Sequence, residues 1–494
     1  MGIVKRDSIA ITVISYVGIA VGYVNKILLF PNFLSEEQVG LTSIIVSLAL
    51  MYAQFSALGT GQGIVKFFPF LKTPDKRNHG LFFWSALTMS AGFLLFTFLF
   101  VLFKGPVMRY FADNAPLLSE YYLYLIPLAL AILFYNFFNS WLQALSKTVF
   151  SSFVYDVGLR LLITAEITLY ALGYMTFQQF MVWYIVIYSV PAIALLVYAA
   201  AIGEISVKIN LSPRAKKMLA IAGIYGIWQF LGGASMYLLP VIDQTMLAGM
   251  KGLAQTGIYT IMLYIVGAMI VPYRSMVKVS TPLVTGYWRE RRMEDMADLY
   301  RKVSVMNLVA GCFFFLVIWV NLDNIFGLMP EAYAEGRYVF LFLALGRIFD
   351  MYAGLNGTIL VTSKKYRYDF VFSIFLLALT VATNVLLIPL WGMKGAAIAT
   401  MATLLIYNIL RLWFVKRFYR MQPFALKDMA AVGITAVAIG ISYAVPYLGN
   451  FFLDAGVRTL IVSAIFCAAV YLMKISPDLN RTADNMIARI KQAL

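Results

Sequence analysis

Apolar runs long enough to cross a lipid bilayer recur fourteen times in this chain, and they constrain its fold more than any other feature. A membrane-spanning helix needs about 20 mostly apolar residues to cross about 30 Å of hydrocarbon. The runs lie at 8–30, 39–60, 80–103, 120–143, 151–173, 180–202, 218–240, 255–273, 303–322, 337–361, 370–390, 394–415, 428–446 and 455–473. Backbone polar groups inside a bilayer must be satisfied within the segment, which favours helices. We therefore expect an all-α polytopic membrane protein with 14 transmembrane helices.

The composition agrees with this interpretation. Hydrophobic residues make up 62% of the 494 residues and charged residues 13%, whereas a soluble domain has about 45–50% apolar residues. This excludes a soluble enzyme, a disordered scaffold and a secreted disulfide protein. Both cysteines, Cys312 and Cys467, lie in apolar runs and are typical of small hydrophobes that face lipid or a core. The longest loop, 274–302, is expected to lie on the membrane surface, so no room remains for a catalytic domain. We expect no enzyme activity.

Basic residues orient the chain, because they resist translocation across the membrane. With the N-terminus inside, alternate loops and the two ends hold 30 of the 39 basic residues. The other side holds five of them, Lys104, Arg109, Lys251, Arg337 and Lys394. We expect both termini in the cytoplasm and the first span to be retained, since no small-residue cleavage site follows it. The net charge of +16 then reflects topology and contact with anionic lipid, not nucleic acid.

An internal repeat at a constant shift of 217 residues relates the two halves of the chain. Gln38-Val39-Gly40-Leu41 matches Gln255-Thr256-Gly257-Ile258, and Asn139 matches Asn356. A shift of six spans keeps both halves in the same orientation, so the repeat is parallel, with its axis along the membrane normal. The predicted domains are a six-helix bundle at 1–210, a second six-helix bundle at 211–420, and two extra helices with a cytoplasmic tail at 421–494.

Four segments resemble a known family. Ala57-Leu-Gly-Thr-Gly-Gln-Gly-Ile-Val-Lys-Phe-Phe-Pro69 is similar to the end of the second span in polysaccharide and O-antigen flippases. Ile388-Pro-Leu-Trp-Gly-Met-Lys-Gly-Ala-Ala-Ile-Ala-Thr400 is similar to their short turn between spans 11 and 12, and the residues around the tenth span, Glu331-Ala-Tyr333 and 356–363, fit the same pattern. These flippases belong to the multidrug/oligosaccharidyl-lipid/polysaccharide exporter superfamily.

The resemblance implies two six-helix bundles in a pseudo-two-fold, V-shaped arrangement around a cavity that opens alternately to either side. The implied substrate is an isoprenoid-pyrophosphate-linked oligosaccharide, moved from the cytoplasmic to the periplasmic leaflet of the bacterial inner membrane for surface polysaccharide or lipopolysaccharide assembly. The implied partners are this lipid, the membrane lipids and other glycan-assembly membrane proteins, and the protein is expected to be a monomer. No cofactor is expected beyond a coupling ion, Na⁺ or H⁺.

Ionisable residues at membrane depth are costly and mark functional sites by default. Asp156 and Arg160 are four residues apart, so they share a helix face, and Arg347 and Asp350, three apart, do the same. Each pair either contributes to a substrate-binding cavity or only neutralises itself within a bundle. An Arg fork can bind phosphate oxygens in a bidentate way, and the two arginines are expected to grip the pyrophosphate, one from each bundle.

Lys26 near the end of the first span is expected either to bind the substrate near the periplasmic end or to reach the membrane interface with its long side chain. At the 217 shift Lys26 falls on Asp243, which carries the opposite charge. Ion coupling, where present, is assigned to Asp156, Glu166 and Asp243.

Two other function classes stay open at this stage. An ion-coupled multidrug exporter on the same fold requires an anionic cavity, whereas the deep charges here are balanced or slightly basic. A glycan polymerase, ligase or lipid-dependent glycosyltransferase requires a catalytic loop with clustered acidic or Arg/His groups, and the short outer loops carry no such cluster.

Overall fold

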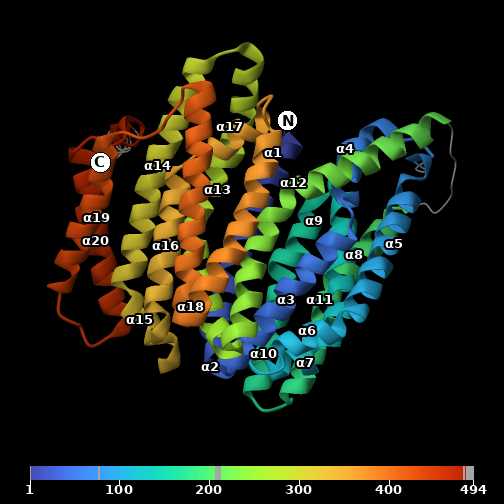
Figure 1. Ribbon diagram of the computed structural model, residues 1–494, viewed down its shortest axis with the longest axis horizontal. Coiled ribbons are helices and arrows are strands. Elements are labelled where there is room, and N and C mark those ends of the chain that lie inside the picture. Colours follow the sequence, from blue (N-terminus) through green and yellow to red (C-terminus); the bar gives the residue numbers. More distant parts are fainter. Residues whose placement is uncertain (1, 76–77, 206–212, 482–483, 486–494) are drawn as a thin grey trace. The chain divides into compact units, whose positions relative to one another are not determined.

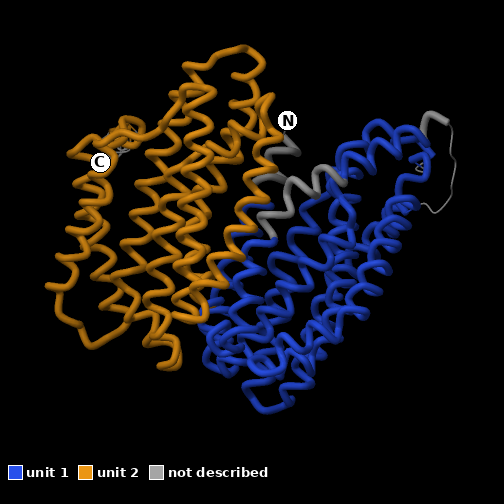
Figure 2. The backbone as a smooth tube through the Cα atoms, in the orientation of Figure 1, with its two compact units in different colours: residues 1–260 blue, residues 261–494 orange. Residues whose placement is uncertain are grey.

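The computed structural model describes residues 2–75, 78–205, 213–481 and 484–485, and these residues form helices and no β-strand (Figure 1). The chain divides into two compact units, residues 1–260 (unit 1) and residues 261–494 (unit 2) (Figure 2). The boundary predicted at residue 210 lies outside the described residues. The helix after it, α12, packs against α3 and α4 within unit 1, although the repeat assigns its span to the second bundle.

The helices follow one another with short connections. Unit 1 contains α1 (Gly2–Tyr23), η1 (Val24–Leu29), α2 (Phe30–Phe33), α3 (Glu36–Ser56), α4 (Thr60–Leu71), η2 (Asn78–Gly80), α5 (Leu81–Leu102), α6 (Lys104–Phe111), α7 (Pro116–Glu120), η3 (Tyr122–Tyr124), α8 (Leu125–Ala144), α9 (Thr148–Ser152), η4 (Phe153–Gly158), α10 (Leu159–Ala171), α11 (Phe177–Ala201) and α12 (Pro213–Lys251). The chain passes into unit 2 within α13 (Leu253–Glu290) and continues through α14 (Met293–Val320), α15 (Leu322–Phe326), η5 (Glu331–Gly336), α16 (Arg337–Tyr352), α17 (Asn356–Thr362), α18 (Arg367–Tyr419), η6 (Leu426–Asp428), α19 (Met429–Tyr443) and α20 (Phe451–Leu472).

The fourteen apolar runs are helical, and the run at 337–361 is divided between α16 and α17. Among the described residues, 11 helices are long and apolar enough to cross a membrane, and a bent pair, 331–352 with 356–362, makes up to 12. The run at 218–240 lies on α12, and α18 contains both runs between 370 and 415. The expected all-α polytopic fold is therefore confirmed.

Helix α18 is two antiparallel spans joined at a sharp turn. Gly392 has φ 55° and ψ −133°, a conformation that only glycine adopts readily. The two halves come back together, because the hydroxyls of Thr383 and Thr403 lie 3.2 Å apart and Arg411 forms an ion pair with Asp369. This is the short turn that the segment 388–400 predicts.

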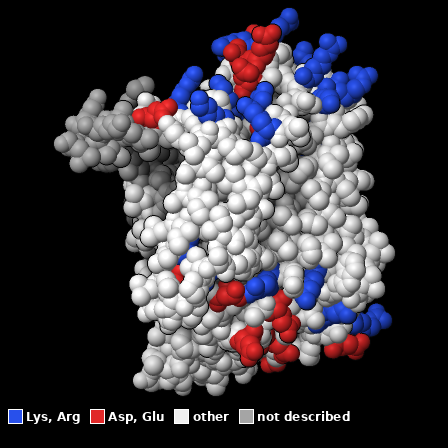
Figure 3. Space-filling model, turned by 90° about the vertical axis from the view of Figure 1, so that its left-hand side faces the viewer, with Lys and Arg blue, Asp and Glu red and all other residues white. Residues whose placement is uncertain are grey.

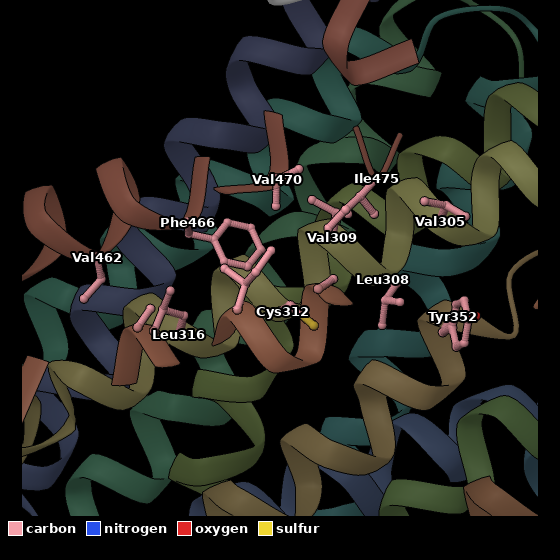
Figure 4. Close-up of a cluster of buried hydrophobic side chains, with 13 residues drawn as sticks. Val305, Leu308, Val309, Cys312, Leu316, Tyr352, Val462, Phe466, Val470 and Ile475 are labelled. Carbon is pink, nitrogen blue, oxygen red and sulfur yellow. The ribbon is translucent and has the colours of Figure 1, made fainter. Parts of the chain in front are cut away.

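Apolar side chains cover the outer surface of the helices as well as the buried core. In unit 2, α19 and α20 pack on α14 through a cluster that includes Val309, Cys312 and Phe466 (Figure 4). On the other side of these helices large apolar residues remain exposed, for example Leu460 at 72%. In the face drawn in Figure 3 an uncharged band separates two charged ends. Such a band is stable in lipid and costly in water.

The segment 274–302 is not the surface loop that the sequence predicts. Helix α13 continues to Glu290, and α14 begins at Met293. One residue, Arg291, has φ 57° and reverses the chain between them. The charged residues in this segment are compatible with helix, so the two helices simply continue past their apolar parts instead of turning onto the membrane.

The repeat is visible as a reciprocal contact within unit 1. A Cβ built on Gly40 would lie 2.1 Å from the carbonyl oxygen of Leu253, and one built on Gly257 would lie 2.2 Å from that of Glu36. Both pairs are related by the shift of 217 residues. Two-fold symmetry produces such reciprocal contacts, in which each residue of a pair meets the equivalent of the other. The pseudo-two-fold axis passes here between Gly40 and Gly257, where the two helix backbones come close together.

We expect Gly40→Ala to destabilise the protein, because the new methyl group meets a backbone atom that cannot move without separating the helices. Overpacking of this kind costs about 1–3 kcal/mol, which thermal unfolding in detergent would detect as a lower Tm. Gly433→Ala is the matched control, since nothing lies within 4 Å of a Cβ at that position in α19. A Gly40→Ala protein that melts with the wild type would contradict the close helix contact.

Candidate functional site

The membrane-depth charges of unit 1 gather where α1 meets the broken helix formed by α9, η4 and α10. Both α1 and this helix contain a π-helical turn, η1 and η4. The amide of Asn25 in η1 donates to the carbonyl oxygen of Arg160 at 2.8 Å and accepts from the hydroxyl of Thr164 at 2.7 Å. Such turns occur frequently at functional sites, because they shift side chains out of the regular helical register.

Asp156 and Arg160 form no ion pair with each other in the described part of the chain. Ser15 Oγ donates to Asp156 Oδ2 at 3.0 Å, while the Arg160 guanidinium lies against Gly22, with Nε 3.1 Å from a Cβ built there. Ser15 and Gly22 are two turns apart along α1, or about 10 Å. Among the described residues no carboxylate lies within ion-pair distance of Arg160. Asp156 and Arg160 therefore each contact α1 and form no ion pair with one another.

Three further predicted residues lie in unit 1. Lys26 in η1 places its Nζ 4.0 Å from the centroid of the Phe30 ring, a cation–π contact. Glu166 in α10 is 3% exposed, and neither of its carboxylate oxygens has a hydrogen-bond partner among the described residues. Asp243 in α12 is 1% exposed and accepts a hydrogen bond from the Tyr259 hydroxyl at 3.1 Å. Leaving a buried carboxylate without a partner is costly, so Glu166 is a candidate site for binding a proton.

In unit 2 the predicted pair forms. Arg347 Nη1 lies 3.4 Å from Asp350 Oδ2 on α16. The other oxygen of Asp350 accepts from the Asn408 amide at 2.9 Å, and Asn356 donates to Asn408 at 3.0 Å. This network joins α16, α17 and the second half of α18. It leaves the Arg347 side chain 23% exposed and already neutralised in part.

A second buried arginine, Arg411, was not among the predicted site residues. Its guanidinium pairs with Asp369, lies 4.2 Å from the centroid of the Tyr407 ring, and retains a buried Nε without a hydrogen-bond partner. A Cβ on Gly357 would lie 2.7 Å from Arg411 Nη1, so this glycine makes room for the side chain. Its position inside the apolar run 394–415 was a signal in the sequence. Arg411 was instead counted among the basic residues of the loops, so it was not considered as a site residue.

The arrangement places cationic side chains within the apolar helices of each unit. Arg160 and Lys26 carry the positive charge in unit 1, and Arg347 and Arg411, each beside an aspartate, carry it in unit 2. Guanidinium groups bind phosphate oxygens through two parallel hydrogen bonds. Chemically, guanidinium and ammonium groups in these positions are suited to hold an anionic group. No cluster of metal ligands occurs in the described residues.

Comparison with known proteins identifies the fold. No protein-family model matches the chain. The capsular polysaccharide biosynthesis protein CapF of Staphylococcus aureus is 22% identical over 181 residues, which is 36% of this chain and 45% of that protein. This chain thus spans less than half the length of the curated relative.

Solved structures match over nearly the whole chain. The lipid II flippase MurJ in an inward closed conformation has a TM-score of 0.74 at 12% identity and covers 95% of this chain and 99% of its own. An inward-facing MATE family multidrug resistance transporter of the MOP superfamily has a TM-score of 0.62 at 15% identity, over 79% of this chain and 92% of its own. The chain therefore has the fold of this superfamily, as the sequence motifs predict.

Proposed function

We propose that the protein is a flippase that moves an isoprenoid-pyrophosphate-linked oligosaccharide between membrane leaflets by alternating access, without covalent chemistry. The observation that carries the proposal is the likeness to a lipid II flippase over nearly the full length of both chains, together with Arg160, which forms no ion pair among the described residues. A glycan head group cannot cross hydrocarbon unaided, and its pyrophosphate requires compensating positive charge when it loses water. The partial likeness to a capsular polysaccharide biosynthesis protein agrees with a glycan substrate.

Reconstitution tests this function. Purified protein in liposomes should move a labelled polyprenyl-pyrophosphate oligosaccharide from one leaflet to the other, so that an added membrane-impermeant enzyme or quencher reaches the glycan label. Chromatography of the recovered lipid should show no new glycosidic or phosphoester product. Protein-dependent product formation would replace the flippase by an enzyme, and a failure to move the lipid would remove the proposal. In cells, deletion of the gene should leave the lipid-linked glycan on the cytoplasmic leaflet and remove surface polysaccharide.

A second candidate is an ion-coupled multidrug exporter. The likeness to a MATE family transporter and the buried carboxyl group of Glu166 favour it. Asp156, Glu166 and Asp243 would then bind the coupling H⁺ or Na⁺. Export of cationic dyes from everted vesicles, sensitive to Glu166→Gln and unaffected by lipid-linked glycan, would support this function over the first.

The proposed location is the inner membrane of a bacterium, with both termini in the cytoplasm and the protein acting as a monomer. Single cysteines at Asp113 and Glu335, in a protein whose own cysteines are replaced, should react with an impermeant maleimide in intact spheroplasts. Cysteines at Arg291 and Lys364 should react only after permeabilisation. All four native side chains lie at exposed positions. Reversed labelling at any two sites would contradict the orientation that the basic residues predict.

A further inference from the structure

Unit 1 contains a cavity with a mixed polar and apolar lining, and none of the charged residues described above lines it. It has a volume of about 500 Å³ and lies between α3, α4, α8 and α12. Its polar lining consists mainly of five carboxamides, with a lysine, a serine and a threonine: Gln54, Gln62, Asn136, Asn139, Gln143, Lys66, Ser140 and Thr60. Small-molecule sites have volumes of about 300–1,000 Å³, so the cavity can hold one or two sugar rings.

Three of the five carboxamides, Asn136, Asn139 and Gln143, belong to a polar stripe on one face of α8. Residues 136, 139, 140 and 143 on α8 are spaced i, i+3, i+4 and i+7, which is one face of a helix. The facing wall is the start of α4, where Gln62 and Lys66 are one turn apart. A polar stripe inside an apolar span is costly unless its groups are solvated or bound.

The hydrogen-bonding groups of these carboxamides are not used by other parts of the protein. None of the five makes a side-chain hydrogen bond within the described chain. The repeat supplies a comparison, because Asn139 corresponds to Asn356 of unit 2. Asn356 is 3% exposed and bonds to Asn408 and to the backbone N–H of Gly357. The same residue type therefore has a structural role in one half and faces a cavity in the other.

The chemistry of the lining indicates the ligand. A carboxamide both donates and accepts hydrogen bonds, as a sugar hydroxyl does. No Asp or Glu is among the described residues that line the cavity, and its only charge is Lys66, held 3.6 Å from the centroid of the Tyr225 ring. A cationic drug or a coupling cation would require carboxylates, and a lipid tail would not require five amides.

We propose that this cavity, which we call the carboxamide pocket, binds the saccharide head group of the transported lipid. The identity of the ligand rests on the proposed function. The pocket lies near the end of α8 that leads to Lys147, which is the expected cytoplasmic side, where the glycan is loaded. The pocket then selects the glycan through its hydroxyls, while the deep arginines bind the pyrophosphate, which every polyprenyl-linked glycan shares.

The test compares two ligands that differ only in the sugar. The first is the polyprenyl-pyrophosphate glycan pool extracted from cells that lack the gene, and the second is polyprenyl pyrophosphate alone. Binding to purified full-length protein in detergent is measured for the wild type, for Asn136→Leu and Asn139→Leu, and for Gln62→Met and Gln143→Met. The last two replace exposed side chains, so they report on the pocket even where a substitution at the half-buried Asn136 or Asn139 impairs folding. Gln178→Met, an exposed carboxamide on α11 outside the pocket, is the matched control.

Each pocket variant should bind the glycosylated lipid about 3- to 10-fold more weakly, as expected for the loss of one hydrogen bond, and should bind polyprenyl pyrophosphate with unchanged affinity. The control should match the wild type for both ligands. Equal loss for both ligands, or no loss for either, overturns the pocket while wild-type transport keeps the proposed function. A wild-type protein that neither binds nor moves the glycan pool overturns both.

Discussion

Arg160→Gln is expected to reduce translocation of the lipid-linked oligosaccharide by about 10- to 100-fold, because hydrogen bonds to charged groups are worth about 1.5–3 kcal/mol. Arg160 forms no ion pair among the described residues, so its removal breaks no close contact with a carboxylate. The variant should therefore fold, insert and melt as the wild type does. Arg160→Lys should keep part of the activity, since it retains the charge and loses the bidentate geometry.

The measurement is the initial rate of translocation in liposomes at matched protein density. Lys104→Gln is the control, because it removes a positive charge at an exposed position on α6. Gly22→Ala gives an independent test, since the added methyl group would crowd the Arg160 guanidinium and should lower the rate without any change of charge. Normal transport by Arg160→Gln would assign this arginine a structural role and would move the search to Lys26 and Arg347.

The fold was predictable because its strongest signal is local. An apolar run of about 20 residues without charge has one stable form in a bilayer, and these runs are helical. The turn at Gly392 and the repeat contact at Gly40 were also visible, as a Gly-rich segment and as a constant shift. The ends of the helices could not be predicted. Helix α13 continues past its apolar part to Glu290, and nothing in the local sequence marks where the membrane surface lies.

The site was harder to predict because its contacts are distant in the sequence. The spacing of Asp156 and Arg160 predicts a helix-face pair, yet Ser15 takes the carboxylate and Gly22 receives the guanidinium. Both come from a helix more than a hundred residues earlier, and spacing carries no information about it. The polar stripe of α8 was visible in the sequence. Its residues carry no charge, so the criterion of ionisable residues at membrane depth did not select them.

The largest effect on stability is expected at Arg411. Its side chain and that of Asp369 are each 13% exposed, and they join the two halves of α18. Arg411→Gln leaves the Asp369 carboxylate buried without its partner, and breaking a buried ion pair in this way costs about 3–5 kcal/mol. We expect a marked loss of Tm and of detergent-resistant protein, whereas Arg292→Gln, which removes an exposed pair with Asp295, should change the Tm little.

The double variant Asp369→Asn with Arg411→Gln separates stability from function, because it removes both charges together. The main cost of breaking a buried pair is the charge that is left without its partner, and the double variant leaves none, so most of the lost Tm should return. Recovery of transport along with stability would make the pair a structural clamp between the two spans. Recovery of stability alone would place Arg411, with its unpartnered Nε, among the groups that hold the pyrophosphate. A double variant as unstable as Arg411→Gln would contradict the ion pair itself.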